Sequence, residues 1–134
     1  MSDQIAANKE VVLATLKALA DADYPRMLSF CDDDIQFYVI GTTKYSGLFA
    51  GKETFWTKLL KPLTDQIGEG GFSEEIITVV GEGDIVVTES RGHEVTTSGV
   101  EYNNEYAFVY RLRAGKILEW RCYLDTMLLD AAHE

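Results

Sequence analysis

The sequence is poor in the residues that build metal sites and disulfide frameworks. It holds only two cysteines, Cys31 and Cys122, and only two histidines, His93 and His133. Neither a CxxC nor an HExxH pattern occurs, so the sequence predicts no metal site of the zinc type. A disulfide between the two cysteines stays open, although the polar N-terminal segment MSDQIAANKE lacks the apolar stretch of a signal peptide.

Basic residues are also scarce. Twelve lysines and arginines stand against 22 aspartates and glutamates, which gives a formal net charge of −10. This charge disfavours binding to nucleic acid phosphates or to an anionic membrane surface. No apolar run approaches the roughly 20 residues of a membrane span. We therefore expect a cytoplasmic protein without nucleic-acid or membrane partners, whose acidic excess lies mainly on its surface.

The composition is otherwise that of a globular chain, with 46% hydrophobic and 25% charged residues among 134. A chain of this length suits one domain, residues 1–134, with a core of its own. Three helices are expected in its first half. Residues 4–20 carry an apolar stripe at three- and four-residue spacing, Pro25 suits the first turn of a short helix at 25–30, and a third stripe begins at Phe55 and is expected to end near Pro62.

Strands are expected in the remainder of the chain. After an acidic turn at 32–34, residues 35–40 are rich in β-formers, and a glycine-containing loop follows at 41–51. Beyond residue 72, short glycine-containing turns divide four long strands, which predicts an antiparallel meander; these strands are 72–80, 84–96, 100–112 and 117–126. The whole predicts an α+β fold, a cone-shaped, curved antiparallel sheet covered by three N-terminal helices around an apolar pocket.

The C-terminal strands carry a resemblance to a known family. The segments YNNEYAFVYRL at 102–112, GKI at 115–117 and EWRCYLDT at 119–126 resemble the end of SnoaL-like domains of the nuclear transport factor 2-like superfamily. The resemblance implies a cystatin-like fold over almost the whole chain. That superfamily includes ketosteroid isomerase, limonene epoxide hydrolase, scytalone dehydratase, polyketide cyclases and non-enzymatic association domains, so the fold does not choose a function.

The catalytic residues of two well-known relatives do not carry over. The general-base aspartate of limonene epoxide hydrolases corresponds here to Cys122, and a neutral thiol cannot replace a carboxylate that activates water. The positions that supply the base and oxyanion hole of ketosteroid isomerase correspond to Thr15, Tyr38 and Phe108, none of which matches. The resemblance therefore implies the scaffold without either catalytic set.

Strand alternation predicts which side chains face the pocket. Together with the third helix, it gives a largely aromatic set of substrate-binding candidates: Phe37, Val39, Trp56, Asn104, Tyr106, Phe108, Trp120 and Cys122. Of these, Asn104 and Tyr106 are expected to orient a carbonyl group. Plain core packing explains the same pattern as well, because aromatic residues at a spacing of two commonly fill cores.

The opposite face alternates charges, with Glu89, Arg91 and His93 on one strand. We expect cross-strand ion pairs there and association of two chains through this convex face. A single β-bulge would instead turn these residues inward. No catalytic residue is identified; Tyr38, Glu89 and His93 are the candidates, and His133 is expected on the surface of the tail.

Two hypotheses follow. The first is a cofactor-independent isomerase, cyclase or lyase that transfers a proton within a small apolar substrate. The second is a non-catalytic ligand-binding or dimerisation module that uses the same pocket. They differ over a buried ionisable group, because only the enzyme needs a carboxylate or imidazole within reach of the cavity.

Overall fold

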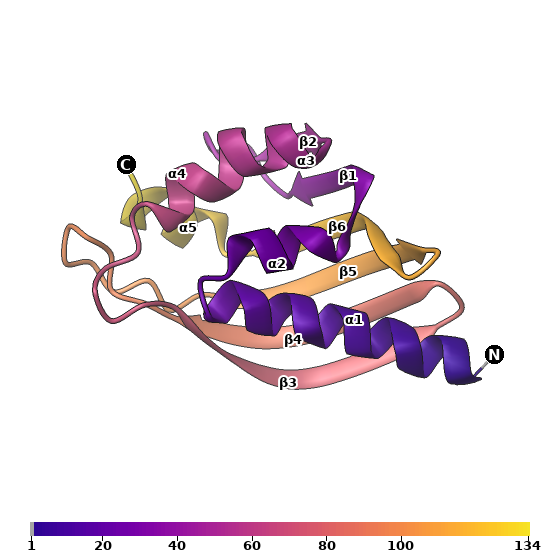
Figure 1. Ribbon diagram of the computed structural model, residues 1–134. Coiled ribbons are helices and arrows are strands. Elements are labelled where there is room, and N and C mark those ends of the chain that lie inside the picture. Colours follow the sequence, from indigo (N-terminus) through magenta and orange to yellow (C-terminus); the bar gives the residue numbers. More distant parts are fainter. Residues whose placement is uncertain (1) are drawn as a thin grey trace.

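The computed structural model describes residues 2–134 and contains a curved sheet with helices on it (Figure 1). Helices and strands follow one another as α1 (Ser2–Ala20), α2 (Tyr24–Ser29), β1 (Cys31–Val39), β2 (Gly47–Ala50), α3 (Lys52–Thr54), a π-helical segment (Phe55–Leu60), α4 (Lys61–Thr64), β3 (Ser73–Glu82), β4 (Ile85–His93), β5 (Glu105–Arg113), β6 (Lys116–Leu124) and α5 (Thr126–Ala132). The fold is α+β, as the sequence predicts.

The sheet contains six strands in the order β2-β1-β6-β5-β4-β3. The antiparallel meander of β3 to β6 is confirmed. The expectation of a wholly antiparallel sheet is wrong, because β1 pairs with β6 in parallel, with Phe37 opposite Trp120. More than half of the chain separates these two strands, so no hairpin turn sets their relative direction, and alternation along one strand cannot reveal it.

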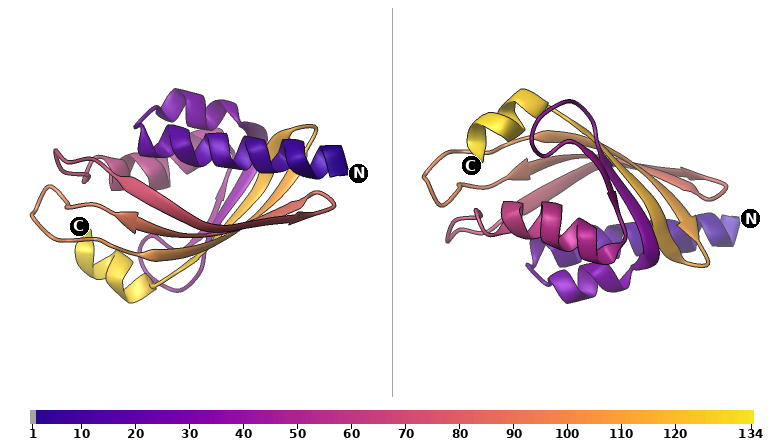
Figure 2. Two further views of the ribbon diagram at one scale, coloured as in Figure 1. Left: turned by 90° about the horizontal axis from the view of Figure 1, so that it is seen from below. Right: turned by 90° about the horizontal axis from the view of Figure 1, so that it is seen from above.

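The three predicted N-terminal helices cover one side of the sheet, and α5 lies across the strands from α1 and α2, at the end of the sheet nearest the C-terminus (Figure 2). Asp23 caps α2, its side chain accepting a hydrogen bond from the Arg26 amide at 3.2 Å. Pro62 does not end the third helix as predicted. It is the second residue after the π-helical segment, and the chain stays helical to Thr64.

Three local features were not predicted. The acidic residues 32–34 belong to β1, whose pairing with β6 is irregular there, and the glycine-containing loop holds the short strand β2. The C-terminal helix α5 begins after Asp125, whose side chain accepts a hydrogen bond from the Leu128 amide at 3.1 Å. Within residues 2–134, no helix combines the length and the apolar character needed to cross a membrane.

The core lies between the helices and the concave face of the sheet. Trp120 is its centre, with ring centroids 5.0 Å from Phe37, 5.7 Å from Phe108 and 5.4 Å from Tyr110. Both cysteines are buried and free, so the disulfide that the sequence left open does not form.

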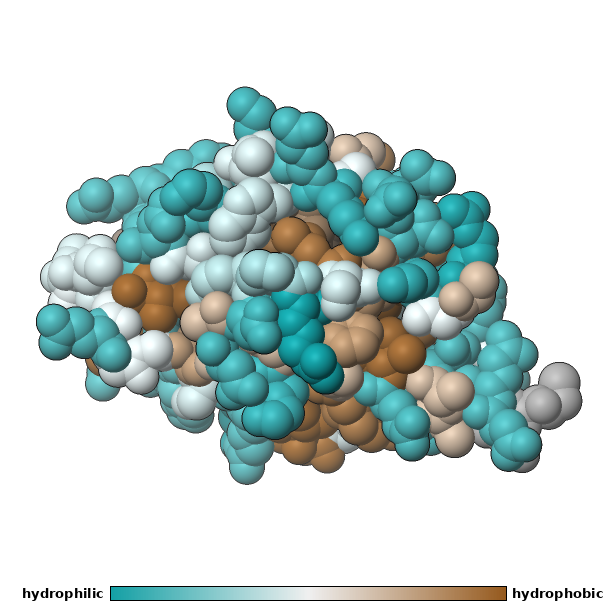
Figure 3. Space-filling model, viewed as in Figure 1, coloured by the Kyte–Doolittle hydropathy of each residue, from teal (hydrophilic) through white to brown (hydrophobic). Residues whose placement is uncertain are grey.

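The outer face of the sheet is only partly polar. On β3, Ile77 is 45% exposed and Val80 is 51% exposed. Figure 3, seen from the helical side, shows hydrophobic residues along the lower edge of the molecule, where β3 runs in Figure 1. Ion pairs flank this apolar region, among them Arg91 with Glu105 at 3.4 Å and Arg111 with Asp84 at 2.9 Å.

Candidate functional site

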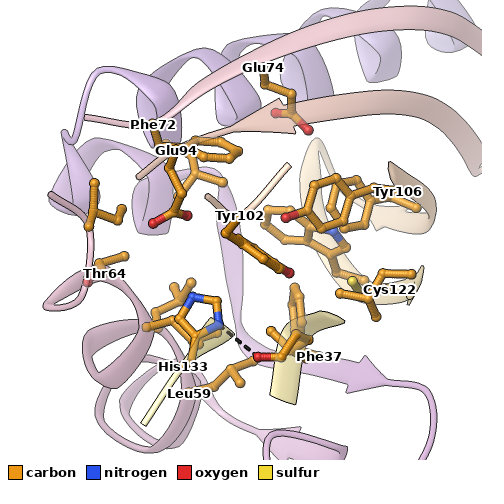
Figure 4. A pocket seen from close by; sticks show the side chains of 18 residues that line it. Phe37, Leu59, Thr64, Phe72, Glu74, Glu94, Tyr102, Tyr106, Cys122 and His133 are labelled. Atoms are coloured by element: carbon orange, nitrogen blue, oxygen red, sulfur yellow. Dashed lines mark hydrogen bonds between the residues drawn. The ribbon is translucent and has the colours of Figure 1, made fainter. Parts of the chain in front are cut away.

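A cavity of about 120 Å³ lies between the concave face of the sheet, α4 and α5 (Figure 4). The structure brings five of the eight predicted binding residues to its wall: Phe37, Tyr106, Phe108, Trp120 and Cys122. Most of the remaining wall is apolar. It also contains ionisable and polar residues that the sequence analysis did not select: Glu74, Glu94, Tyr102 and His133.

The other three predicted binding residues do not line this cavity. Val39 is buried in the core, and Trp56 packs against Tyr24 with ring centroids 5.3 Å apart. Asn104 is fully buried, but its side chain is occupied by protein groups: Nδ2 donates to the Tyr102 hydroxyl at 3.0 Å and to the Asp125 carbonyl at 3.0 Å. Asn104 therefore reaches the cavity only through Tyr102.

The three catalytic candidates of the sequence lie away from the cavity. The guanidinium of Arg121 stacks over the Tyr38 ring at 4.7 Å, and Glu89 accepts a hydrogen bond from the Thr78 hydroxyl at 2.8 Å. His93 is exposed at the end of β4. The strand has no bulge against β5, so these residues keep the outward direction that simple alternation predicts.

Glu94 is the most buried acid of the cavity wall. It follows β4 directly and is only 9% exposed, and its backbone pairs with that of Tyr102 through hydrogen bonds of 2.9 and 3.3 Å. Its Oε2 atom has no hydrogen-bond partner among residues 2–134. Burial raises the pKa of Glu94 to about 7. The same alternation that turned Glu89 outward, continued beyond His93, would have identified Glu94 from the sequence.

Glu74 is the second carboxyl group of the wall. Its strand neighbour across the β3–β4 pair is Gly92, and the Ser90 hydroxyl donates to its Oε2 atom at 2.7 Å. Its Oε1 atom has no hydrogen-bond partner within the described chain. Desolvation raises the pKa of Glu74, and the hydrogen bond from Ser90 opposes that rise.

His133 is buried, which corrects the expectation that it lies on the surface of the tail. Its Nδ1 atom lies 2.8 Å from the Leu129 carbonyl oxygen. A carbonyl only accepts hydrogen bonds, so Nδ1 carries the proton of the neutral ring and Nε2 keeps its lone pair. Desolvation is the main cause that lowers the pKa of His133, so the neutral form is favoured.

The chain end that carries His133 is held by residues far away in the sequence. The Lys44 ammonium donates to the His133 carbonyl at 3.1 Å, and the Tyr45 hydroxyl donates to the main-chain oxygen of Glu134. The Glu134 amide donates to Gln66 Oε1 at 2.8 Å. The ring of His133 packs edge-on against Tyr102, with centroids 4.5 Å apart. No periodic pattern in the sequence predicts these contacts, because single side chains from separate segments make them.

The cavity also presents hydrogen-bond donors. Trp120 is 2% exposed, and its Nε1 atom has no acceptor among residues 2–134. Desolvation raises the pKa of Tyr102 to about 12, so this phenol stays protonated; because Asn104 donates to its oxygen, its own proton is free for another acceptor. Burial raises the pKa of the Cys122 thiol, which leaves it neutral. An acid with a pKa near neutrality and two neutral donors thus share one apolar cavity.

The chain is similar to a family of known proteins and to several solved structures. The model of the SnoaL-like domain family matches residues 12–120. No curated protein matches the chain.

Three solved structures are similar in fold. A nuclear transport factor 2-like protein of unknown function from Burkholderia pseudomallei has a TM-score of 0.83 at 15% identity, over 95% of this chain and 97% of that chain. A protein from Jannaschia described as a SnoaL-like polyketide cyclase has a TM-score of 0.78 at 17% identity, over 96% and 92%. An epoxide hydrolase from M. tuberculosis, similar to limonene epoxide hydrolases, has a TM-score of 0.75 at 19% identity, over 96% and 90%. At these identities the likeness extends to the fold alone.

Proposed function

The chain belongs to the SnoaL-like domain family, and from this premise we propose that it is a cofactor-independent enzyme that moves a proton within a small, largely apolar carbonyl compound. The proposal rests on Glu94. This carboxyl group is desolvated in an apolar cavity, one of its oxygens has no partner within the described chain, and its pKa is raised to about 7. A general base is most effective when its pKa lies near the working pH.

The proposed reaction needs a base and a stabilised oxyanion. The Glu94 carboxylate removes a proton from the carbon next to the carbonyl; the C–H bond breaks, its electron pair enters an enolate, and Glu94 holds the proton. Trp120 Nε1–H and the Tyr102 hydroxyl are the neutral donors available to the enolate oxygen. Return of the proton to another atom of the same molecule completes an isomerisation, and loss of a leaving group from the enolate completes a lyase reaction.

A purely structural role explains Glu94 less well. An unpaired buried polar group costs about 1 to 3 kcal/mol, and a charged one costs more. A carboxyl group kept at such a cost in a cavity wall is the pattern of a functional acid or base. A binding module would tolerate glutamine or an apolar residue here, which makes the position the best place to test the two hypotheses.

The experiment follows exchange of protons for deuterium without requiring knowledge of the natural substrate. Small ketones such as cyclohexanone and acetophenone are incubated with the protein in deuterium oxide, and loss of the proton signal beside the carbonyl is measured by NMR. We expect catalysed exchange, which falls by about a hundredfold in Glu94→Gln. Glu89→Gln, on the outer face, is the matched control and should exchange at the parent rate. Binding of the ketones without faster exchange in the parent protein would favour the binding module.

We also propose that two copies associate through the outer face of the sheet. Val80, Val87 and Val109 lie side by side across β3, β4 and β5 on this face, and ion pairs flank them. Sedimentation at micromolar concentration should give about twice the mass of one chain, and Val80→Lys should halve it. Leu48→Lys, an exposed apolar position on β2, is the control. A parent mass of 15.0 kDa would contradict the proposal.

A further inference from the structure

We propose that the cavity selects an uncharged, single-ring molecule that carries a hydrogen-bond donor as well as a carbonyl acceptor, and that it rejects carboxylates. This inference rests on the proposed function and names its substrate class. It follows from three properties of the cavity wall: the sign of its charges, its unpaired hydrogen-bonding atoms, and its size.

The charges of the wall exclude anions. The ionisable residues that line the cavity are acids, phenols, a thiol and one neutral imidazole; no lysine or arginine of residues 2–134 lines it. The nearby ammonium of Lys44 is bound to the His133 carbonyl oxygen. A carboxylate ligand would therefore lose its hydration and meet Glu74 and Glu94 without a cation to pair with, and burial of an unpaired charge is costly.

The unpaired atoms of the wall need a ligand that both donates and accepts hydrogen bonds. Glu74 Oε1 and Glu94 Oε2 accept hydrogen bonds, whereas Trp120 Nε1 only donates. Glu94 and Trp120 are more than nine-tenths buried, so a ligand is the partner that their geometry leaves room for. An ammonium group would satisfy the two carboxyl groups but not the indole N–H. A hydroxyl group together with a carbonyl oxygen satisfies both kinds of atom.

The two carboxyl groups belong to the wall of one cavity. Glu74 lies opposite Gly92 in the β3–β4 pair, Glu94 directly follows the end of β4, and both residues line the cavity. Figure 4 shows the carboxyl group of Glu74 directed toward the ring of Tyr106, and that of Glu94 directed toward the side of the cavity where Thr64 and His133 lie.

The size of the cavity limits the ligand to a single ring. Its volume of about 120 Å³ is close to that of an engineered apolar cavity of about 150 Å³ that binds benzene. The rings of Phe72 and Tyr106 narrow it over Gly92: a Cβ atom at this glycine would stand 2.7 Å from Phe72 Cε1 and 3.0 Å from Tyr106 Cε2. Only a residue without a side chain allows both rings to close over this part of the wall.

Three probes of one ring size test the inference: meta-hydroxybenzaldehyde, meta-methoxybenzaldehyde and meta-hydroxybenzoate. None of them can undergo the proposed proton transfer, so they report binding alone. Trp56→Phe removes the tryptophan outside the cavity and leaves Trp120 as the only one, whose fluorescence then reports occupancy. At a pH of about 7.5 we expect the hydroxyaldehyde to bind at least about tenfold more tightly than the methoxy compound, and the benzoate to bind more weakly than either.

The variants Glu74→Gln and Glu94→Gln, made in the same background, should bind the benzoate more tightly than the parent does, with Glu89→Gln as the unchanged control. Equal binding of all three probes, or no binding of any, would overturn the inference. Because the exchange assay uses different compounds, loss of selectivity with exchange intact contradicts only the substrate class. Selectivity without exchange contradicts only the proposed reaction.

Discussion

The two faces of the same sheet treat charged residues in opposite ways. On the outer face, acids and bases pair across strands in water, as Arg91 and Glu105 do. On the concave face, Glu74 and Glu94 stand among aromatic rings with an oxygen each that no described group satisfies. Glu89 and Glu94 lie five positions apart in the sequence, and their side chains point to opposite faces of the sheet. The direction of the side chain on its strand, rather than the residue type, therefore decides which acid lines the cavity.

The largest expected difference in stability between the two faces is at Trp120. Trp120→Ala removes the ring that packs on Phe37, Phe108 and Tyr110 and should destabilise the protein by about 3 to 5 kcal/mol. Tyr123, whose hydroxyl accepts from Arg121 Nε at 3.1 Å, is the counterpart on the outer face of the same strand. Urea unfolding should show a clearly smaller loss for Tyr123→Ala. Equal losses would mean that both faces contribute alike to the core.

The next effect is expected at Gly92. Gly92→Ala brings a methyl group within 2.7 Å of Phe72 and should cost about 1 to 3 kcal/mol, because the rings that close the cavity must move. Gly70→Ala is the control, since its Cβ atom would have no neighbour within 4 Å. Thermal unfolding measures both variants. A neutral Gly92→Ala would show that Phe72 is free to move aside, and the size limit of the cavity would be withdrawn.

Much of this fold follows from local pattern. The apolar stripe of α1, the β-formers of β1 and the glycine-containing turns between β3 and β6 predicted the correct elements, because each signal lies within a few residues. The parallel pairing of β1 with β6 was out of reach, since the partners are far apart in the chain and no turn relates them. The helix α5 is short and follows a strand directly, so its few apolar positions continue a strand pattern equally well.

The site was predictable only in part. Alternation brought Phe108, Trp120 and Cys122 to the cavity wall as predicted, since their strands are regular. Glu94 obeys the same alternation but lies just beyond the regular strand, and its burial depends on the segment that returns at Tyr102. His133 is buried because Lys44 and a few other side chains hold the chain end, and no pattern within one segment encodes that contact.

The pH dependence of stability measures the effect of burial on Glu94. Burial raises the pKa of Glu94 in the folded protein to about 7, above its ordinary value of 4.5. Between these values the folded state binds more protons than the unfolded state, so this group's contribution to stability falls as the pH rises and is lost above about 7. Relative to Glu94→Gln, the parent should lose about 2 to 3 kcal/mol from pH 5 to pH 8.

Chemical unfolding at several pH values measures this difference. Taking the difference between parent and variant removes the contribution of His133, whose lowered pKa acts in the opposite direction at acid pH. Glu89→Gln on the outer face is the matched variant that removes a carboxyl group outside the cavity. A flat difference between the parent and Glu94→Gln would show that Glu94 is ionised in the fold as easily as in water, and would remove the base of the proposed reaction.

The smallest effect is expected where the outer face is most polar. Arg91 and Glu105 lie opposite each other on β4 and β5, 3.4 Å apart, with side chains 56% and 78% exposed. Water and salt screen such a pair, and holding two long side chains together costs entropy, so Arg91→Ala should change stability by no more than about 0.5 kcal/mol. The difference should vanish in 1 M salt, measured by urea unfolding. A larger loss that resists salt would mean that this pair is shielded from water, as it would be if a second chain covered the outer face. The environment of the outer face would then differ less from that of the concave face than the single chain indicates.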